Sequence, residues 1–242
     1  MIDTGCPYTL IDRASTRRIG LGVKETKSYV VGVVGNAERY GVSELATLAM
    51  GNCTFTNVPV EVADESQINF ISRPHLDGLF GAHEMAKFGM IVDCARQMVY
   101  VNPKGSSAAT TQKLAEFLTA RGFTRIPMRF NPEYHLEVDA GINGHPVRLI
   151  VDTGASTTLL SSSVASASGT SLSPLYSAGG EGIGRVQQLT LGNLVINNAE
   201  VTVAKAAKFV GAGLLGGEYL SWNFAVVDVG GMNLYLRPPD KR

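Results

Sequence analysis

One three-residue motif, Asp-Thr-Gly, occurs twice in this chain of 242 residues, at positions 3–5 and 152–154. Apolar residues precede both copies, and both run on into a threonine and an aliphatic pair, at 9–11 and 158–160. At average residue frequencies, one chance copy in a chain of this length has odds of roughly 0.05. Two copies with matching flanks therefore indicate a common origin.

Further short sequence motifs recur in the same order in the two halves of the chain. An apolar-apolar-Gly word stands at 79–81 and at 214–216, and an apolar run ending in Asp stands at 90–93 and at 225–228. The offset between these words is 135 residues (216 − 81), whereas the Asp-Thr-Gly copies lie 149 apart (152 − 3). A repeat of this length indicates a duplicated domain rather than a solenoid.

At these residues the sequence resembles the aspartic proteases of the retropepsin and pepsin type, and most of all the retropepsin-like proteases, with two units fused in one polypeptide. The resemblance implies a mainly all-β fold of two retropepsin-like β-barrel lobes related by a pseudo-twofold axis. We expect a first lobe at 1–103, a linker and helix at 104–122, and a second lobe at 123–242. A monomer with pseudo-dimeric lobes is the expected assembly.

The composition agrees with a strand-rich fold. Gly is abundant, at 27 residues, and the apolar runs are short and rich in Val, Ile and Leu, which favours short strands joined by tight turns. Apolar residues on one helical face predict a helix at 111–121, after a Ser/Ala/Thr-rich linker. Shorter helices are expected at 82–88 and 218–222.

The two halves differ at their starts. Before the second Asp-Thr-Gly word the sequence predicts strands at 125–130, 134–138 and 146–151, with an Asn-Gly hairpin turn before the last. Only Met1 and Ile2 precede the first word. We interpret the chain as a fragment of a longer product; the alternative is a first lobe without its opening strands, and an incomplete first lobe would allow a dimer. The compartment is not assigned, and an exported or periplasmic location would need an upstream signal.

The paired carboxyl groups of Asp3 and Asp152 are the candidate catalytic residues. Two carboxyl groups close enough to share one proton can act together, the charged one as a base on water and the neutral one as an acid. The pKa values of such a dyad belong to the pair, so neither role is assigned to one residue. Each repeat supplies a single Asp, so the duplication completes the site.

The neighbours of each Asp are expected to support its loop. The resemblance implies that the hydroxyl groups of Thr4 and Thr153 hydrogen-bond across to the opposite loop. Gly5 and Gly154 permit a tight turn and present backbone N–H groups to the carboxylates.

Glycine-punctuated strands around 29–41 and 176–184 resemble the flaps of the family, which are hairpins that close over a substrate. Gly35, Gly180 and Gly182 are therefore candidate substrate-contacting residues. The alternative for each segment is an ordinary surface hairpin.

The first loop departs from the family pattern. It continues as Cys6, Pro7 and Tyr8, where the family usually has a small residue followed by Ser or Asp, and Pro7 removes a backbone donor. The second loop fits better.

Other classes of function find little support. Lys plus Arg and Asp plus Glu both number 21, so the chain has no excess of positive charge that would attract nucleic acid. No apolar run approaches the ~18 residues that a membrane-spanning helix needs. The G-x-G-x-x-G pattern at 211–216 is broken in its repeat counterpart at 76–81. The four His residues lack metal-ligand spacing, the three Cys residues do not form a disulfide framework, and Cys6 lacks a nearby base.

The sequence therefore predicts an aspartic endopeptidase that binds an extended polypeptide as an added strand and uses no metal or organic cofactor. The rival is a protease-like module that binds peptides without cutting them. A third hypothesis is a chain that cuts only after assembly with a second chain.

Overall fold

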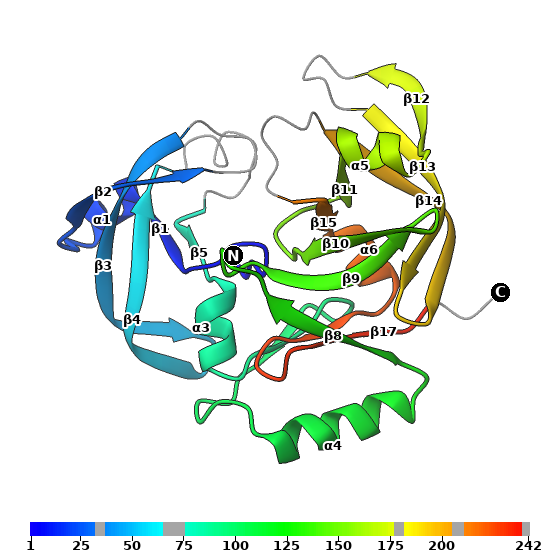
Figure 1. Ribbon diagram of the computed structural model, residues 1–242. Helices are drawn as coiled ribbons and strands as arrows, with labels where there is room; N and C mark the ends of the chain where they lie inside the picture. Colours follow the sequence, from blue (N-terminus) through cyan, green and yellow to red (C-terminus); the bar gives the residue numbers. More distant parts are fainter. Residues whose placement is uncertain (32–36, 65–75, 177–181, 205–210, 239–242) are drawn as a thin grey trace.

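The computed structural model describes residues 1–31, 37–64, 76–176, 182–204 and 211–238, and it has two lobes built mainly from strands (Figure 1). The elements of the first half are β1 (Leu10–Asp12), α1 (Arg13–Arg18), β2 (Lys24–Val31), β3 (Ala37–Met50), β4 (Cys53–Ala63), β5 (Gly78–Leu79), α3 (Ala82–Lys87), β6 (Ile91–Asp93) and β7 (Met98–Tyr100). The predicted all-β, two-lobed fold is confirmed.

The second half repeats these elements in the same order, after an additional helix and three additional strands. The additional elements are α4 (Ala108–Thr119), β8 (Thr124–Phe130), β9 (Leu136–Ile142) and β10 (His145–Val151). The repeated elements are β11 (Leu159–Ser161), α5 (Ser162–Ala167), β12 (Ser171–Tyr176), β13 (Gly182–Leu191), β14 (Leu194–Ala204), β15 (Gly213–Leu215), α6 (Gly217–Trp222), β16 (Val226–Asp228) and β17 (Asn233–Leu236).

Strand pairing in the two lobes follows one plan. The first lobe has the order β2-β3-β4-β1-β5, and the second has the matching order β12-β13-β14-β11-β15. In the second lobe the sheet continues through β10 to β9, and β9 pairs back onto β13 with Leu189 opposite Ile142. The strands from β13 round to β9 therefore close into a barrel.

A shared sheet joins the two halves of the chain. It runs in the order β8-β17-β16-β6-β7, and β16 pairs with β6 so that Val227 lies opposite Val92. Both residues belong to one hydrophobic cluster that also contains Phe80 of the first half and Leu215 of the second. The proposed boundaries at 103 and 123 therefore separate segments that share a sheet and a core.

Helix α4 begins three residues before the predicted start. Ser107 caps it by accepting a hydrogen bond from the backbone N–H of Thr110, whose side chain bonds back to the Ser107 backbone. Leu118 and Ala115 pack with the fully buried Tyr235 of β17. Within the described residues no helix is both long and apolar enough to cross a bilayer.

The sequence did not predict α1, the helix after β1, and it offered only a polar turn or a helix start at 161–163, where α5 follows β11. Each has only six residues, too few for a clear helical repeat of apolar positions. Side-chain caps start both: Asp12 accepts from the backbone N–H of Ser15, and Ser161 accepts from that of Val164.

Candidate active site

The two Asp-Thr-Gly loops follow equivalent parallel pairings, which are strand β10 in the second lobe and an isolated bridge at Ile2 in the first. The backbone N–H of Asp152 donates to the carbonyl of Leu215 at 3.0 Å, and that of Asp3 donates to the carbonyl of Phe80 at 3.1 Å. Ile2 bridges Phe80 in the parallel sense, as Val151 of β10 pairs with Leu215 of β15. Each Asp therefore sits directly after a residue fixed in a sheet, as predicted.

Backbone N–H groups hold one oxygen of each carboxyl group. Oδ1 of Asp3 accepts from the N–H groups of Gly5 at 2.9 Å and Cys6 at 3.1 Å. Oδ1 of Asp152 accepts from those of Gly154 at 2.8 Å and Ala155 at 2.9 Å. Asp3 is 9% exposed and Asp152 is 7% exposed, so these hydrogen bonds hold both carboxyl groups in a largely buried position.

Burial and the opposing carboxyl group raise the pKa of Asp3 to about 7, from 3.8. Desolvation is the largest cause, followed by the negative charge of Asp152 and the side-chain hydrogen bond to it, while the N–H groups of Gly5 and Cys6 act in the opposite direction. Two carboxyl groups in contact cannot both ionise easily, so the pair retains a proton at mildly acidic pH.

Hydrogen bonds of Thr4 and Thr153 join the two loops across the interface between the lobes. The Thr4 hydroxyl donates to the Val151 carbonyl at 2.7 Å and accepts from the Thr153 N–H at 3.1 Å. Thr153 repeats the pattern: its hydroxyl donates to the Ile2 carbonyl at 3.0 Å and accepts from the Thr4 N–H at 3.1 Å. This reciprocal arrangement is the one that the resemblance implied.

The loop glycines are needed because each faces the opposite carboxyl group. A Cβ placed on Gly154 would lie 2.5 Å from Cγ of Asp3, and a Cβ on Gly5 would collide with the carboxyl group of Asp152. These close approaches place each Asp side chain against the other loop.

We expect Gly154→Ala to lower the free energy of unfolding by about 3 kcal/mol, because the methyl group must displace a buried carboxyl group. Gly22→Ala is the control, since within the described residues no heavy atom lies within 4 Å of its Cβ position. Urea unfolding measures both. Equal stability of the two variants would contradict the close approach.

Buried hydrogen bonds connect the segments that contain the apolar-apolar-Gly motifs to the segments that follow the Asp-Thr-Gly loops. The backbone N–H and the hydroxyl of Thr9 both donate to Oε2 of Glu84, at 2.8 and 2.7 Å, and that hydroxyl accepts from the N–H of Gly81. In the second lobe Glu218 accepts from the N–H of Thr158. Sequence reasoning missed these glutamates, because they occupy different positions in the repeated words.

The departures in the first loop leave its backbone pattern intact. The carbonyls of Cys6 and Pro7 accept from the N–H groups of Ala82 and His83, at 2.8 and 2.9 Å. The corresponding carbonyls of Ala155 and Ser156 accept from the start of α6 in the same way. The Cys6 thiol donates to the carbonyl of Tyr8 at 3.0 Å.

His135 is a second residue that sequence reasoning did not place near the loops. Its Nδ1 lies 2.9 Å from the carbonyl oxygen of Gly5, although the two residues are 130 positions apart. Neighbouring Tyr134 packs its ring on Tyr8 and on His83, with centroid distances of 5.7 and 6.0 Å. The turn between β8 and β9 thus braces the first loop from the second half of the chain.

The flap residues are only partly placed. Gly35 and Gly180 lie outside the described residues. Gly182 begins β13, where it is buried and pairs with Val203. The paired strands β2 with β3 and β12 with β13 form the two predicted hairpin arms. Their role as flaps stays a prediction.

The described residues contain no group of three or more His, Cys, Asp or Glu side chains arranged to hold a metal ion. The G-x-G-x-x-G segment of the sequence contains β15 and ends at Gly216, the N-cap residue of the six-residue helix α6.

Two family models match the chain, and each match contains one of the two Asp-Thr-Gly loops. A family profile described as aspartyl protease matches residues 1–83, and the gag-polyprotein aspartyl protease profile matches residues 138–222. The comparison with curated proteins found no match. Fold and site define a two-lobed protein of the aspartic protease type. Each half of the chain thus matches a model of an aspartyl protease family, so the chain carries two units of this type.

Two solved structures illustrate the likeness. A retropepsin-like aspartic protease from Rickettsia conorii is 21% identical with a TM-score of 0.38, and the match covers 47% of this chain and 90% of that one. The retroviral protease-like domain of Ddi1 from Leishmania major is 18% identical with a TM-score of 0.33, covering 47% and 100%.

Proposed function

We propose that the protein is an aspartic endopeptidase that hydrolyses peptide bonds of an extended polypeptide, with Asp3 and Asp152 as its catalytic residues. The observation that supports this most is the mutual placement of the two buried carboxyl groups, each fixed by two N–H groups and facing the other loop. A turn aspartate with only a structural role has no need of a second carboxyl group beside it.

Hydrolysis by this pair needs one proton shared between the two carboxyl groups. The ionised carboxylate removes a proton from a water molecule, whose oxygen attacks the peptide carbonyl carbon, while the neutral carboxyl group protonates the carbonyl oxygen. The tetrahedral intermediate then collapses: the C–N bond breaks, the nitrogen takes up a proton, and an acid and an amine leave. The reciprocal threonine contacts keep both carboxyl groups in one fixed geometry throughout.

The substrate would lie as an extended strand between the lobes, since a strand offers its backbone groups to flanking loops and hairpins. The test is cleavage of a permanently unfolded, fluorescently labelled protein, with product termini identified by mass spectrometry. We expect pepstatin to inhibit cleavage, and EDTA or iodoacetamide to leave it unchanged. Tight binding of the labelled protein without any cleavage would favour the non-cutting module instead.

The pH profile provides an independent prediction. Because the pKa of Asp3 is raised to about 7, the pair should lose its shared proton as the pH rises through that value. We expect kcat/KM to fall about tenfold for each pH unit above it, as the acid form is titrated away. Initial rates measured between pH 4 and 9 check this. A rate that still rises between pH 7 and 9 would contradict the shared-proton mechanism.

A further inference from the structure

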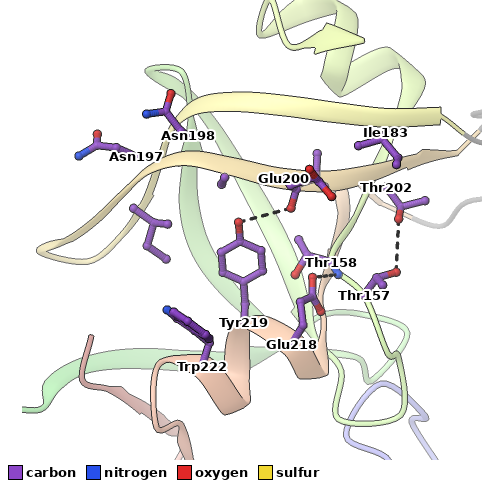
Figure 2. A pocket seen from close by; sticks show the side chains of 13 residues that line it. Thr157, Thr158, Ile183, Asn197, Asn198, Glu200, Thr202, Glu218, Tyr219 and Trp222 are labelled. Carbon is purple, nitrogen blue, oxygen red and sulfur yellow. Dashed lines mark hydrogen bonds between the residues drawn. The ribbon is translucent and has the colours of Figure 1, made fainter. Parts of the chain in front are cut away.

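A pocket of about 480 Å³ lies in the second lobe between helix α6 and strand β14 (Figure 2). Ile183 and Ile196 line it together with the rings of Tyr219 and Trp222, and the Tyr219 hydroxyl donates to the backbone carbonyl of Glu200 at 3.4 Å. Trp222, the last residue of α6, is 71% exposed, more than any other large apolar side chain in the described part of the chain. An open aromatic ring beside an apolar pocket is typical of a binding site rather than of a packed core.

Two carboxylates line the same pocket, one from each of these elements. Glu200 belongs to β14 and Glu218 to α6, and both are exposed. Glu218 and Trp222 are four residues apart on α6 (222 − 218), which places them on one face of the helix. Burial, followed by the charges of Glu218 and Glu200, raises the pKa of Tyr219 to about 12. Both negative charges therefore act on the aromatic wall of the pocket.

Neighbouring cations do not balance these two charges. Among the described residues that line the pocket there is no Lys, Arg or His. Arg185 of β13 lies opposite Glu200 in the ladder, but within the described residues Glu200 forms no ion pair. Oε1 of Glu218 accepts from the N–H of Thr158, which leaves Oε2 for a ligand. The pocket thus combines apolar walls, an exposed indole ring and negative charge.

We propose that this pocket binds a basic side chain of the polypeptide substrate, arginine above lysine. A neutral apolar group would cover part of both carboxylates without compensating their charge, and an anion would be repelled. A cation over Trp222 is attracted by the negative face of the indole, while its aliphatic stem packs on apolar groups such as Ile183. Arginine fits better than lysine, because a planar guanidinium group both stacks on a ring and binds a carboxylate with two N–H groups.

The pocket adjoins the candidate active site through the second Asp-Thr-Gly loop. Thr157 and Thr158 line it and follow Asp152 by five and six residues (157 − 152 and 158 − 152). Five residues of chain span at most about 17 Å, a distance that an extended substrate covers with about five residues. A substrate held at the two aspartates would therefore carry its basic residue within about five positions of the scissile bond. This inference rests on the proposed endopeptidase function.

The equivalent place in the first lobe has the opposite character. By the repeat offset of 135, helix α3 carries His83 where α6 has Glu218, and Lys87 where α6 has Trp222. His83 also packs its ring against Tyr8, at a centroid distance of 5.6 Å. Two lobes of one plan would otherwise accept an extended strand in either direction. A cation site in the second lobe favours one direction, so the basic residue should lie on one side of the scissile bond.

The first arm of the test measures binding without cleavage. Trp222 is the only tryptophan of the chain, so its fluorescence reports on the pocket. The protein is titrated with N-acetylarginine amide and with its neutral isostere, N-acetylcitrulline amide. We expect a saturable change in emission with the arginine compound and at least about tenfold weaker binding of the citrulline one. Glu200→Gln should weaken arginine binding, whereas Glu44→Gln, which removes an exposed charge from β3, should not. Equal responses to the two compounds, or none to arginine, would overturn the proposal.

The second arm measures cleavage of matched peptides that carry arginine or citrulline at each of about five positions on either side of one cleaved bond. At one position on one side, we expect kcat/KM to be about tenfold higher for arginine, mainly through a lower KM. Glu200→Gln and Trp222→Leu should each reduce this ratio to about twofold, and Glu44→Gln should preserve it. An unchanged ratio in the first two variants would contradict the site.

The two arms separate this inference from the proposed function. Cleavage without any preference for arginine would contradict the cation site and leave the endopeptidase function intact. Binding of the arginine compound at Trp222 without cleavage of any polypeptide would contradict the endopeptidase function, and the substrate role of the pocket with it. Binding of that compound together with equal cleavage of the arginine and citrulline peptides would show that the pocket takes a free cation rather than a side chain of the substrate.

Discussion

Asp152→Asn is expected to reduce peptide-bond cleavage by at least about 10³-fold while the chain remains folded. The amide can neither take a proton from water nor share one with Asp3, so the pair loses its acid–base function. Asp3→Asn should have the same effect, and the double variant should lose little more, because the two carboxyl groups act as one unit. Single-turnover cleavage of the unfolded substrate measures all three.

Stability separates this loss of activity from a loss of fold. The pKa of Asp3 is raised from 3.8 to about 7, so its contribution to stability is fully present below about pH 4 and is lost as the pH rises through 7. Removing the charge of Asp152 relieves part of that loss. We therefore expect Asp152→Asn to have a higher Tm than the parent chain at pH 8, and to differ less from it at pH 4.

Asp139→Asn is the matched control for the dyad variants. Asp139 is an exposed carboxylate on β9 that pairs with Arg129, and it lies outside the loops. Its replacement should leave cleavage unchanged. Full activity in Asp152→Asn, or equal losses in Asp139→Asn and Asp152→Asn, would remove the dyad from the mechanism.

Thr4→Val is expected to lower the free energy of unfolding by about 4 kcal/mol and to cut activity by at least about tenfold. The isosteric methyl group leaves the Val151 carbonyl and the Thr153 N–H without their partner, and each orphaned buried group costs roughly 1–3 kcal/mol. Activity falls because the two loops are no longer held in one relative position. Denaturant unfolding and kcat/KM give the two values.

Thr4→Ser keeps the hydroxyl group and should recover most of both losses. Thr153→Val should resemble Thr4→Val, because its contacts are the mirror of those of Thr4. The four hydrogen bonds form one network, so the double variant should lose less than the sum of the singles. Additive losses, or a Thr4→Ser variant as damaged as Thr4→Val, would argue against a shared clasp.

Local sequence signals were sufficient for the tips of the two Asp-Thr-Gly loops and for the hairpin that precedes the second loop. The apolar residues before Asp3 and Asp152 predict a turn tip after a sheet position, and both residues have that setting. The Asn-Gly turn predicted the β9–β10 hairpin, whose turn residue Asn143 has a positive φ of 50°. These features depend on residues within one or two turns of chain, so they can be read without knowledge of the fold.

Short helices and helix starts were harder to predict. The six residues of α1 offer less than two helical turns of pattern, and the cap of α4 uses Thr110 where the familiar capping box has Glu or Gln. Packing on Tyr235 holds α4 in place, and Tyr235 lies more than a hundred residues further along the chain.

By itself, the sequence determined the duplication, the strand-rich class and the two candidate acids, because apolar spacing and turn chemistry are local properties that each repeat carries. Only the tertiary structure brought the Asp3 and Asp152 carboxyl groups into opposition, joined β6 to β16, and placed Glu84 and His135 against the first loop. It also revealed that Tyr100 and Tyr235, which occupy equivalent positions in the two repeats, are 50% and 0% exposed. Contacts between distant segments depend on how the two lobes pack together, and no local pattern encodes that packing.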